Sequence, residues 1–138
     1  MNYRHAYHAG NFADVFKHTA LISVLQHLRK KEAPFAVIDT HAGRGIYDLR
    51  SDMASKTLEA REGVMRLRPV GDLRGVLRLY ADTVRGFGDT KYPGSPLIAA
   101  RMLRPQDRLI AVEKHAEEFA ALKANLGPSD RATAMTGD

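Results

Sequence analysis

The sequence of 138 residues has no cysteine and no tryptophan, and each of its six prolines stands alone. Without cysteine there is no disulfide framework, no thiolate metal site and no cysteine nucleophile, which fits a reducing cytoplasm. No run approaches the roughly 20 apolar residues of a membrane helix, and the first residues lack the apolar core of a signal peptide. We therefore expect a soluble, cytoplasmic protein without membrane association.

Acidic side chains are the scarcer charge, and the formal net charge is +5 at neutral pH. A basic balance is compatible with a polyanionic partner such as nucleic acid, although many basic domains bind none. The length corresponds to one domain of about 100 to 150 residues, which is short for an α/β domain.

One stretch dominates the pattern: the apolar run from Phe35 to Ile38 ends in Asp39 and a turn that holds Gly43 and Gly45. A short continuous apolar run that feeds a turn is typical of a buried parallel strand. Glycine permits positive φ and lets the backbone approach a cofactor, and an acid at the carboxyl end of a strand lies beside the ligand crevice. The stretch therefore predicts a ligand-binding turn.

The spacing of this turn excludes two common phosphate motifs. A dinucleotide fingerprint requires a third glycine where this chain has Asp48, and a phosphate-binding loop requires Lys and Ser or Thr where it has Ile46 and Tyr47. The remaining pattern, D-x-x-x-G-x-G, resembles the first motif of S-adenosylmethionine-dependent methyltransferases. An ordinary glycine-rich βα turn in an unrelated α/β protein is the alternative.

The rest of the chain reads as alternating helices and strands. Asn11 is a candidate N-cap for a helix that ends in the basic run 29–31, and Ser95 with Pro96 is a candidate start for another. Further strands are expected at 109–112, ending in Glu113, and at 132–135, with a helix at 115–126 between them.

We expect an α/β fold with a partial, three-stranded parallel sheet and a small helical insertion. The predicted organisation is an N-terminal segment with the start of the core at 1–50, the insertion at 51–92, and the continuation of the core at 93–138. A sheet of three parallel strands would leave a hydrophobic edge and faces uncovered.

Several motifs taken together closely resemble the bacterial 23S ribosomal RNA adenine-N6 methyltransferases. The resemblance runs from residue 3 to residue 138 and is carried by Tyr3-Arg4-His5, His8-Ala9-Gly10-Asn11, Ala13-Asp14, Lys17-His18, Asp39-Thr40-His41-Ala42-Gly43 and Tyr92-Pro93-Gly94-Ser95-Pro96. It implies a Rossmann-like methyltransferase core, S-adenosylmethionine as methyl donor and an adenine of 23S ribosomal RNA as acceptor.

One departure from that family concerns catalysis. The enzymes that the chain resembles rely on an Asp-Pro-Pro-Tyr motif on the strand after the one that would end at Asp138, and this sequence has no adjacent prolines. We expect no catalytic residue in these residues, and we expect them to be the N-terminal part of a longer enzyme that does not methylate alone.

The resemblance and the strand ends together select the candidate site residues. Glu113, at a strand end, could accept hydrogen bonds from the cofactor ribose, or could simply favour the start of the next helix. The resemblance implies that the cofactor is bound by His18, His41, Gly43, Ser95, Glu113 and Asp138, and that the RNA is contacted by Tyr3, with Arg4 available to a phosphate.

Three alternatives remain open. His5 and His8, with His18 or Asp14, could suggest a metal site, but no zinc-binding helix pattern accompanies them, and we expect no metal. The chain could be a non-catalytic RNA-binding fragment or a degenerate paralogue. An oxidoreductase with a nicotinamide cofactor is disfavoured by Asp48. The sequence leaves the oligomeric state and the modified adenine undetermined.

Overall fold

The computed structural model describes residues 4–67 and 70–137 of the chain. The chain divides into two compact units, each made of two stretches of sequence. The first unit consists of the residues up to Ala20 together with Tyr47–Tyr92. The second unit consists of Leu21–Ile46 together with the residues from Pro93 onward. Helix α1 (Phe12–Leu28) begins in the first unit and ends in the second.

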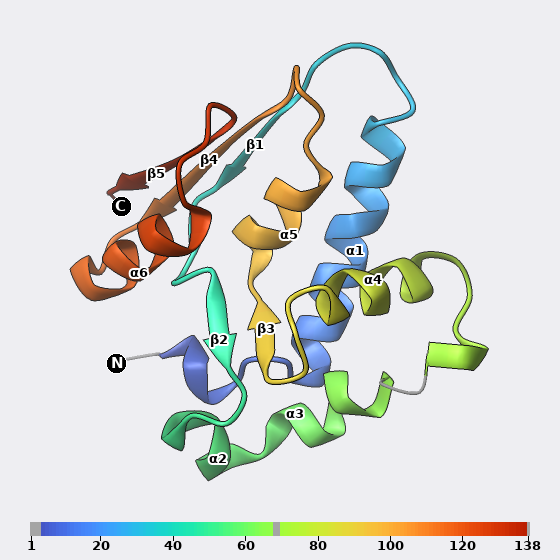
Figure 1. Cartoon of the computed structure of the whole chain (residues 1–138), viewed down its shortest axis with the longest axis vertical. Coiled ribbons are helices and arrows are strands. Elements are labelled where there is room, and N and C mark those ends of the chain that lie inside the picture. Colours follow the sequence, from blue (N-terminus) through green and yellow to red (C-terminus); the bar gives the residue numbers. More distant parts are fainter. Residues whose placement is uncertain (1–3, 68–69, 138) are drawn as a thin grey trace. The chain divides into compact units, whose positions relative to one another are not determined.

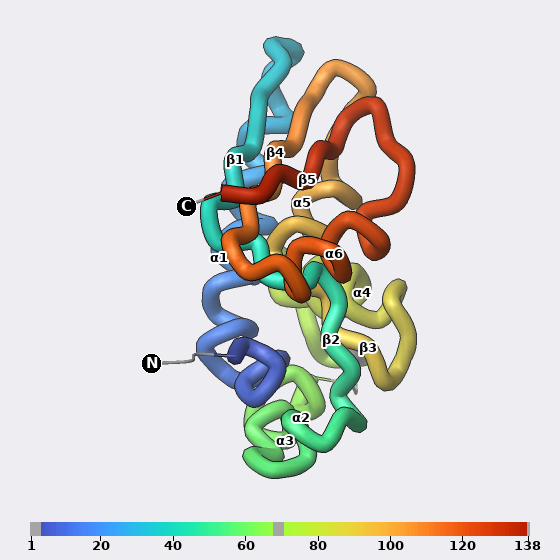
Figure 2. The backbone as a smooth tube through the Cα atoms, turned by 90° about the vertical axis from the view of Figure 1, so that its left-hand side faces the viewer, coloured from blue at the N-terminus to red at the C-terminus, as the bar shows by residue number. Residues whose placement is uncertain are grey.

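The second unit is built on a three-stranded parallel sheet with the order β1-β4-β5. Its strands and helices are β1 (Ala36–Asp39), α5 (Ser95–Met102), β4 (Arg108–Glu113), α6 (Ala116–Leu126) and β5 (Ala132–Thr136). Figure 2 shows β4 between β1 and β5, and the labels of Figure 1 locate α5 and α6 beside the strands. The predicted α/β class, the parallel sheet and its three strands are confirmed.

The two faces of this sheet differ in cover. Helices α5 and α6 pack against the strands, and Leu109 and Ala111 of β4 are fully buried. Because side chains alternate along a strand, their neighbours in sequence point to the other face. There Ile38 is 64% exposed and Met135 is 49% exposed, so one face is covered and the other is open, as a sheet of three strands predicts.

The turn after β1 depends on Gly45. Its φ is +84°, and a Cβ at this position would lie 2.4 Å from Cδ2 of Leu97 and 3.3 Å from Cδ1 of Leu122. The Gly45 carbonyl accepts a hydrogen bond of 2.7 Å from the N–H of Gly94, just before α5. Helices α5 and α6 therefore pack so closely on the turn that only glycine fits there without rearrangement.

The first unit is mainly helical and holds a short two-stranded sheet of β2 (Ile46–Asp48) and β3 (Lys91–Pro93). The pair of strands was not predicted from the sequence. Helices occupy most of the predicted insertion: α2 (Asp52–Thr57), α3 (Glu59–Glu62), η2 (Val64–Leu67), η3 (Val70–Asp72) and α4 (Gly75–Arg85), preceded by η1 (His5–Tyr7) near the N-terminus. None of the helices in the described part of the chain is long and apolar enough to cross a membrane. The division at residues 50 and 92 stays a prediction.

Several predicted details of the helices are corrected by the structure. The helical spacing of Leu58, Val64, Met65 and Leu67 predicts one helix over 58–67, but the structure has none of that length. Leu58 adopts left-handed φ, and the N–H of Val64 donates to the carbonyl of Gly10 instead of continuing the turn. Helix α1 ends at Leu28, so the basic run follows the helix and does not form its last turn. Val24 recurs at helical spacing with Leu21 and Leu28, which predicts a core position, but it is exposed.

The N-terminal segment is held on the first unit by two histidine–carboxylate pairs. His5 Nε2 lies 2.8 Å from Oδ2 of Asp14, and His8 Nδ1 lies 3.0 Å from both carboxylate oxygens of Glu59. Asn11 donates to Glu59 over 3.0 Å, and its own side-chain oxygen accepts from the N–H of Asp14, which confirms it as the cap of α1. The polar start of the chain is therefore ordered from residue 5 by side-chain contacts.

Asp14 is fully buried, yet it is ionised at neutral pH. Burial by itself would raise its pKa, but the hydrogen bond and charge of His5, the charge of His18 and the N–H of Gly10 outweigh burial and lower the pKa to about 2. Lys17 adds an ion pair of 3.1 Å. A carboxyl whose pKa is lowered by folding stabilises the fold above its unfolded pKa and loses that effect as the pH falls through the folded pKa.

We predict that Asp14→Asn lowers the free energy of unfolding at pH 7 by about 2 kcal/mol, the equivalent of the lowered pKa. The difference between the two proteins should shrink as the pH falls from about 4 toward 2, where the wild-type carboxyl becomes protonated. Urea unfolding of both proteins across this range measures it. A difference that does not change with pH would contradict the assignment of an ionised Asp14.

We predict that Gly45→Ala destabilises the chain by about 1–3 kcal/mol more than Gly75→Ala, because the added methyl group overpacks against Leu97. Gly75 is the matched control: its φ is also positive, +60°, but no atom lies within 4 Å of a Cβ built there. Urea unfolding followed by circular dichroism gives both values. Equal losses would show that backbone strain alone, and not close packing of α5, requires glycine at residue 45.

Candidate functional site

The carboxyl end of β1 carries a hydrogen-bonded pair, Asp39 and Ser95. The Ser95 hydroxyl donates to Oδ2 of Asp39 over 2.5 Å, and the N–H of His41 donates to Oδ1 over 3.2 Å. Ser95 is the first residue of α5. The N-cap of this helix is Gly94, and no side chain caps the helix. The predicted role of Ser95 as N-cap is therefore wrong: its hydroxyl ties α5 to the end of β1 instead.

Glu113 ties together the loops that follow β1 and β4. Its Oε2 accepts from the N–H of Gly43 over 2.9 Å, and its Oε1 accepts from the N–H of His115 over 2.8 Å. The side chain is only 8% exposed. Gly43 has φ +64°, so this loop also uses a conformation that favours glycine. The carboxylate thereby holds both loops in place at the carboxyl ends of the strands.

These contacts leave capacity for a ligand. An ionised carboxylate offers about four acceptor sites, and the two backbone N–H groups occupy one on each oxygen of Glu113. The side chain can accordingly accept further hydrogen bonds from a pair of hydroxyl groups. In open α/β sheets, nucleosides usually bind at the carboxyl ends of the parallel strands, where an acid can accept hydrogen bonds from the ribose hydroxyls.

A second set of contacts supports the turn from α6. Arg44 forms a bidentate ion pair with Glu118, with N–O distances of 2.9 and 2.6 Å. The Arg44 carbonyl accepts a hydrogen bond of 2.8 Å from the side-chain amide of Asn125. Bidentate arginine–carboxylate pairs fix orientation as well as distance. The turn that carries Gly43 is therefore rigidly attached to the helix after β4.

His18 belongs to the first unit, where it takes part in a buried chain of hydrogen bonds. Its Nδ1 lies 2.7 Å from the hydroxyl of Tyr92, and that hydroxyl lies 3.0 Å from the hydroxyl of Tyr80. The rings of His18 and Tyr92 stack with centroids 5.7 Å apart. Burial raises the pKa of both tyrosines far above their ordinary value, so both hydroxyls stay protonated. Tyr92 thereby fixes the orientation of the His18 ring.

The structure brings some of the predicted site residues together. His41, Gly43, Ser95 and Glu113 all lie at the carboxyl ends of β1 and β4, with the His41 ring 2.9 Å from the Thr40 hydroxyl. Of the other predicted site residues, His18 and the exposed Arg4 belong to the first unit, and Tyr3 and Asp138 lie outside the described residues.

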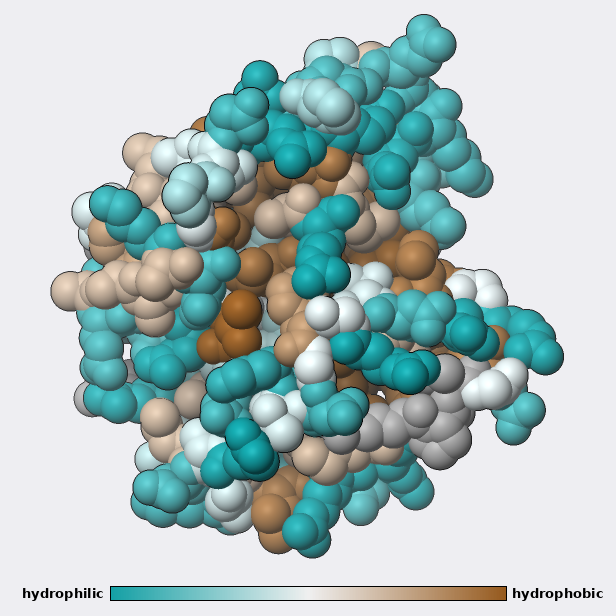
Figure 3. Space-filling model, viewed as in Figure 1, coloured by the Kyte–Doolittle hydropathy of each residue, from teal (hydrophilic) through white to brown (hydrophobic). Residues whose placement is uncertain are grey.

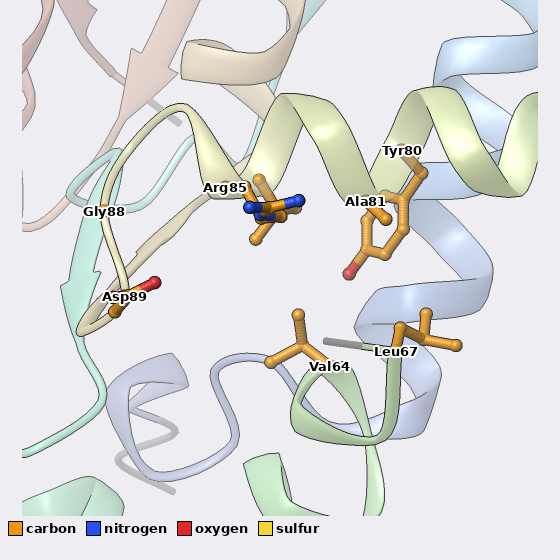
Figure 4. Close-up of a pocket in the computed structure, with 8 residues that line it drawn as sticks. Val64, Leu67, Tyr80, Ala81, Arg85, Gly88 and Asp89 are labelled. Carbon is orange, nitrogen blue, oxygen red and sulfur yellow. The ribbon is translucent and has the colours of Figure 1, made fainter. Parts of the chain in front are cut away.

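The first unit also contains a cavity of about 150 Å³ between η2, α4 and the loop that follows α4 (Figure 4). Its walls combine apolar side chains with the polar side chains of Tyr80, Arg85 and Asp89. None of the predicted site residues within 4–67 and 70–137 lines this cavity. Among the residues that the structure describes, no group of three or more His, Cys, Asp or Glu side chains could hold a metal ion. The carboxyl end of the sheet is therefore the candidate site.

Comparison with known proteins identifies the family. The sequence model described as ribosomal RNA large subunit methyltransferase D, RlmJ, matches residues 32–138. The chain belongs to the RlmJ family. The recognition made from the N-terminal motifs and the glycine turn is thereby confirmed, and so is the assignment to a family of ribosomal RNA methyltransferases.

Two curated relatives of the RlmJ family are named ribosomal RNA large subunit methyltransferase J. The protein of Escherichia coli (strain K12) is 40% identical over 142 residues, which cover 100% of this chain and 51% of the relative. The protein of Haemophilus influenzae is 39% identical over 138 residues, covering 96% of this chain and 49% of the relative. The chain spans about half the length of these relatives.

A solved structure supports the partial Rossmann-like fold. The crystal structure of protein LPL1258 from Legionella pneumophila superposes with a TM-score of 0.80 at 34% identity. The match covers 93% of this chain and 48% of that protein. The chain is therefore similar in fold to about half of this RlmJ-like structure.

Two sets of hydrogen bonds made by the predicted site residues were missed in the sequence. The partners Asp39 and Ser95 were both noted, but not their hydrogen bond, and Tyr80 and Tyr92 were not connected to His18. Tyr92 and His18 are 74 residues apart, so no local spacing signals the contact. The signal available was Tyr92 itself, an aromatic residue inside the Tyr-Pro-Gly-Ser-Pro motif.

We predict that Tyr92→Phe destabilises the chain by about 1–3 kcal/mol, because both the buried His18 Nδ1 and the Tyr80 hydroxyl lose a partner. Tyr80→Phe is the matched control and should cost less, since it removes one of the two bonds. In the Tyr92→Phe background the Tyr80→Phe change should cost almost nothing. Urea unfolding of the four proteins completes the double-mutant cycle, and fully additive losses would rule out the hydrogen-bonded chain.

Proposed function

We propose that the chain forms the methyl-donor part of an enzyme that methylates the N6 amino group of an adenine in 23S ribosomal RNA, with S-adenosylmethionine as donor. Family membership and the names of the relatives support ribosomal RNA as substrate. The observation that carries the proposal is the Glu113 carboxylate, held by Gly43 and His115 at the carboxyl end of the sheet. Action on ribosomal RNA would place the enzyme in the cytoplasm.

The residues at this end fit the proposed donor. Glu113 retains acceptor sites for the two ribose hydroxyls, and the glycine at residue 43 lets the loop backbone approach a ligand. Ser95 and the start of α5 would meet the amino-acid part of the donor, the hydroxyl exchanging its present partner Asp39 for the ligand. His18, His41 and Asp138 remain predicted contacts.

S-adenosylmethionine would supply a methyl group bonded to a positively charged sulfur. The adenine amine is a poor nucleophile, because its lone pair is delocalised into the ring, so the reaction depends on positioning and on hydrogen bonds to that amine. The residues of this chain would bind and orient the donor, and Tyr3 and Arg4 would contact the RNA. The Asp-Pro-Pro-Tyr motif expected to hold the amine is absent from these 138 residues.

A second candidate function is a non-catalytic RNA-binding protein, with which the formal net charge of +5 is compatible. The two candidates differ in what the purified chain binds. A donor-binding part of a methyltransferase binds S-adenosylhomocysteine, the product of methyl transfer, whereas a degenerate RNA-binding protein does not need to. Under both, the isolated chain should not methylate RNA.

We predict that the chain binds S-adenosylhomocysteine and that Glu113→Gln weakens binding by about 10- to 100-fold, the equivalent of losing charge-assisted hydrogen bonds. Glu117→Gln, an exposed acid in the first turn of α6, is the matched control and should bind as the wild type does. Isothermal titration calorimetry gives the affinities, and circular dichroism confirms that each protein is folded. A folded chain that does not bind, or equal binding by Glu113→Gln, would refute the donor site.

A further inference from the structure

The charges of the second unit are divided between the two ends of its sheet. The connections that lead into β1 and β4 lie at the amino ends of the strands, at the top of Figure 1, and teal, hydrophilic atoms cover the same end in Figure 3. Five exposed cations gather on these connections and on the last turn of α5. We name this cluster the basic end: Arg29, Lys30, Lys31, Arg101 and Arg108.

The acids near the basic end neutralise little of this charge. Asp107 is fully buried and is occupied by Arg104, whose guanidinium donates to its two oxygens over 2.8 and 2.9 Å and holds its pKa well below the usual range. Asp130 lies 3.8 Å from Arg131. The remaining nearby acid in the α1–β1 connection is Glu32. The basic end therefore carries a clear net positive charge.

The basic end is also held in shape. The Arg104 guanidinium donates to the carbonyls of Lys31 and Ala33 over 2.6 and 3.0 Å, which attaches the α1–β1 connection to the α5–β4 connection. Arg108 Nη1 donates to the carbonyls of Pro105 and Asp107 over 2.9 and 2.8 Å. A fixed backbone presents these cations together, so less conformational entropy is lost when a polyanion binds.

The opposite end of the sheet has the opposite charge. The carboxyl ends of β1 and β4 carry Asp39 and Glu113, with the exposed Lys114 and Glu117 beside them, and Arg44 there is occupied by Glu118, so the acids outnumber the cations at this end. Strand β4 separates the ends by about 20 Å at 3.3 Å per residue, which exceeds the screening length of about 8–10 Å in physiological salt. The acids therefore do not cancel the attraction of the basic end for phosphates.

We propose that the basic end binds the phosphate backbone of the RNA, at a place remote from the donor site. This proposal rests on the proposed function, which identifies the polyanion as the substrate RNA. The acidic residues at the donor end of this unit would repel the phosphates of that RNA. Exposed lysines and arginines that contact phosphates give affinity without sequence preference and release counterions on binding. The basic end thus holds a flanking part of the RNA while the target adenine lies elsewhere.

The test compares wild type with Lys30→Gln/Lys31→Gln in binding a labelled single-stranded oligoadenylate, by fluorescence anisotropy at several salt concentrations. Losing two phosphate contacts should reduce the slope of log affinity against log salt by about 1.4, which corresponds to about 25-fold weaker binding in 0.1 M salt. Lys56→Gln/Arg61→Gln is the matched control, because both residues are exposed cations of the first unit. It should retain the wild-type affinity and slope.

Three results would overturn the proposal: no binding by the wild type, unchanged affinity and slope in Lys30→Gln/Lys31→Gln, or equal losses in both double variants. Thermal unfolding excludes misfolding as the cause of a loss, since the four substituted side chains are exposed. Titration of the same proteins with S-adenosylhomocysteine separates this proposal from the donor site. Failure of donor binding with RNA binding retained would refute the donor site alone, and unchanged donor binding with lost RNA binding is the expected result for Lys30→Gln/Lys31→Gln.

Discussion

The arrangement of the loops at the carboxyl ends of the parallel strands depends on one buried carboxylate, that of Glu113. Parallel strands end at a common edge, but the loops that follow them diverge unless something joins them. Glu113 accepts one backbone N–H from the loop after β1 and one from the loop after β4, at Gly43 and His115. The same oxygens keep acceptor sites for hydroxyl groups. The contact that joins the two loops is therefore made by the same group that we propose to bind the donor ribose.

The sequence predicted the fold where a local pattern decides the structure. The run 35–38, the strand at 109–112 and the cap at Asn11 each depend on neighbouring residues, and each element is present in the structure. The predicted burial of the first strand is wrong, because Ala36 and Ile38 lie on an uncovered face and are exposed. The pattern failed where contacts from distant residues decide. Leu58 breaks a regular apolar spacing, and the pairing of β2 with β3 joins two three-residue segments that carry no alternation long enough to detect.

The site could be predicted to the same extent. Strand ends and glycines are visible in sequence, so Glu113 and Gly43 could be found from the order of apolar runs and turns. The Ser95 hydroxyl could not be assigned, because a serine before proline at a helix start reads as a cap whatever its real partner is. Its bond to Asp39, 56 residues away in sequence, exists only in the folded unit. Residues that orient another side chain, as Tyr92 orients His18 by a hydrogen bond, are the hardest to predict from sequence.

The separation of charge in the second unit matches the two ligands of the proposed reaction. The proposed methyl donor carries a positive sulfur, and the end that would hold it bears Asp39 and Glu113, whose negative charge would attract the donor and repel phosphates. RNA is a polyanion, and the basic end that would attract it lies at the amino ends of the strands, beyond the screening length. A single mixed surface would weaken both attractions. Placing the acids at the carboxyl ends of the strands and the cations at the amino ends lets one small sheet serve a cationic donor and an anionic substrate together.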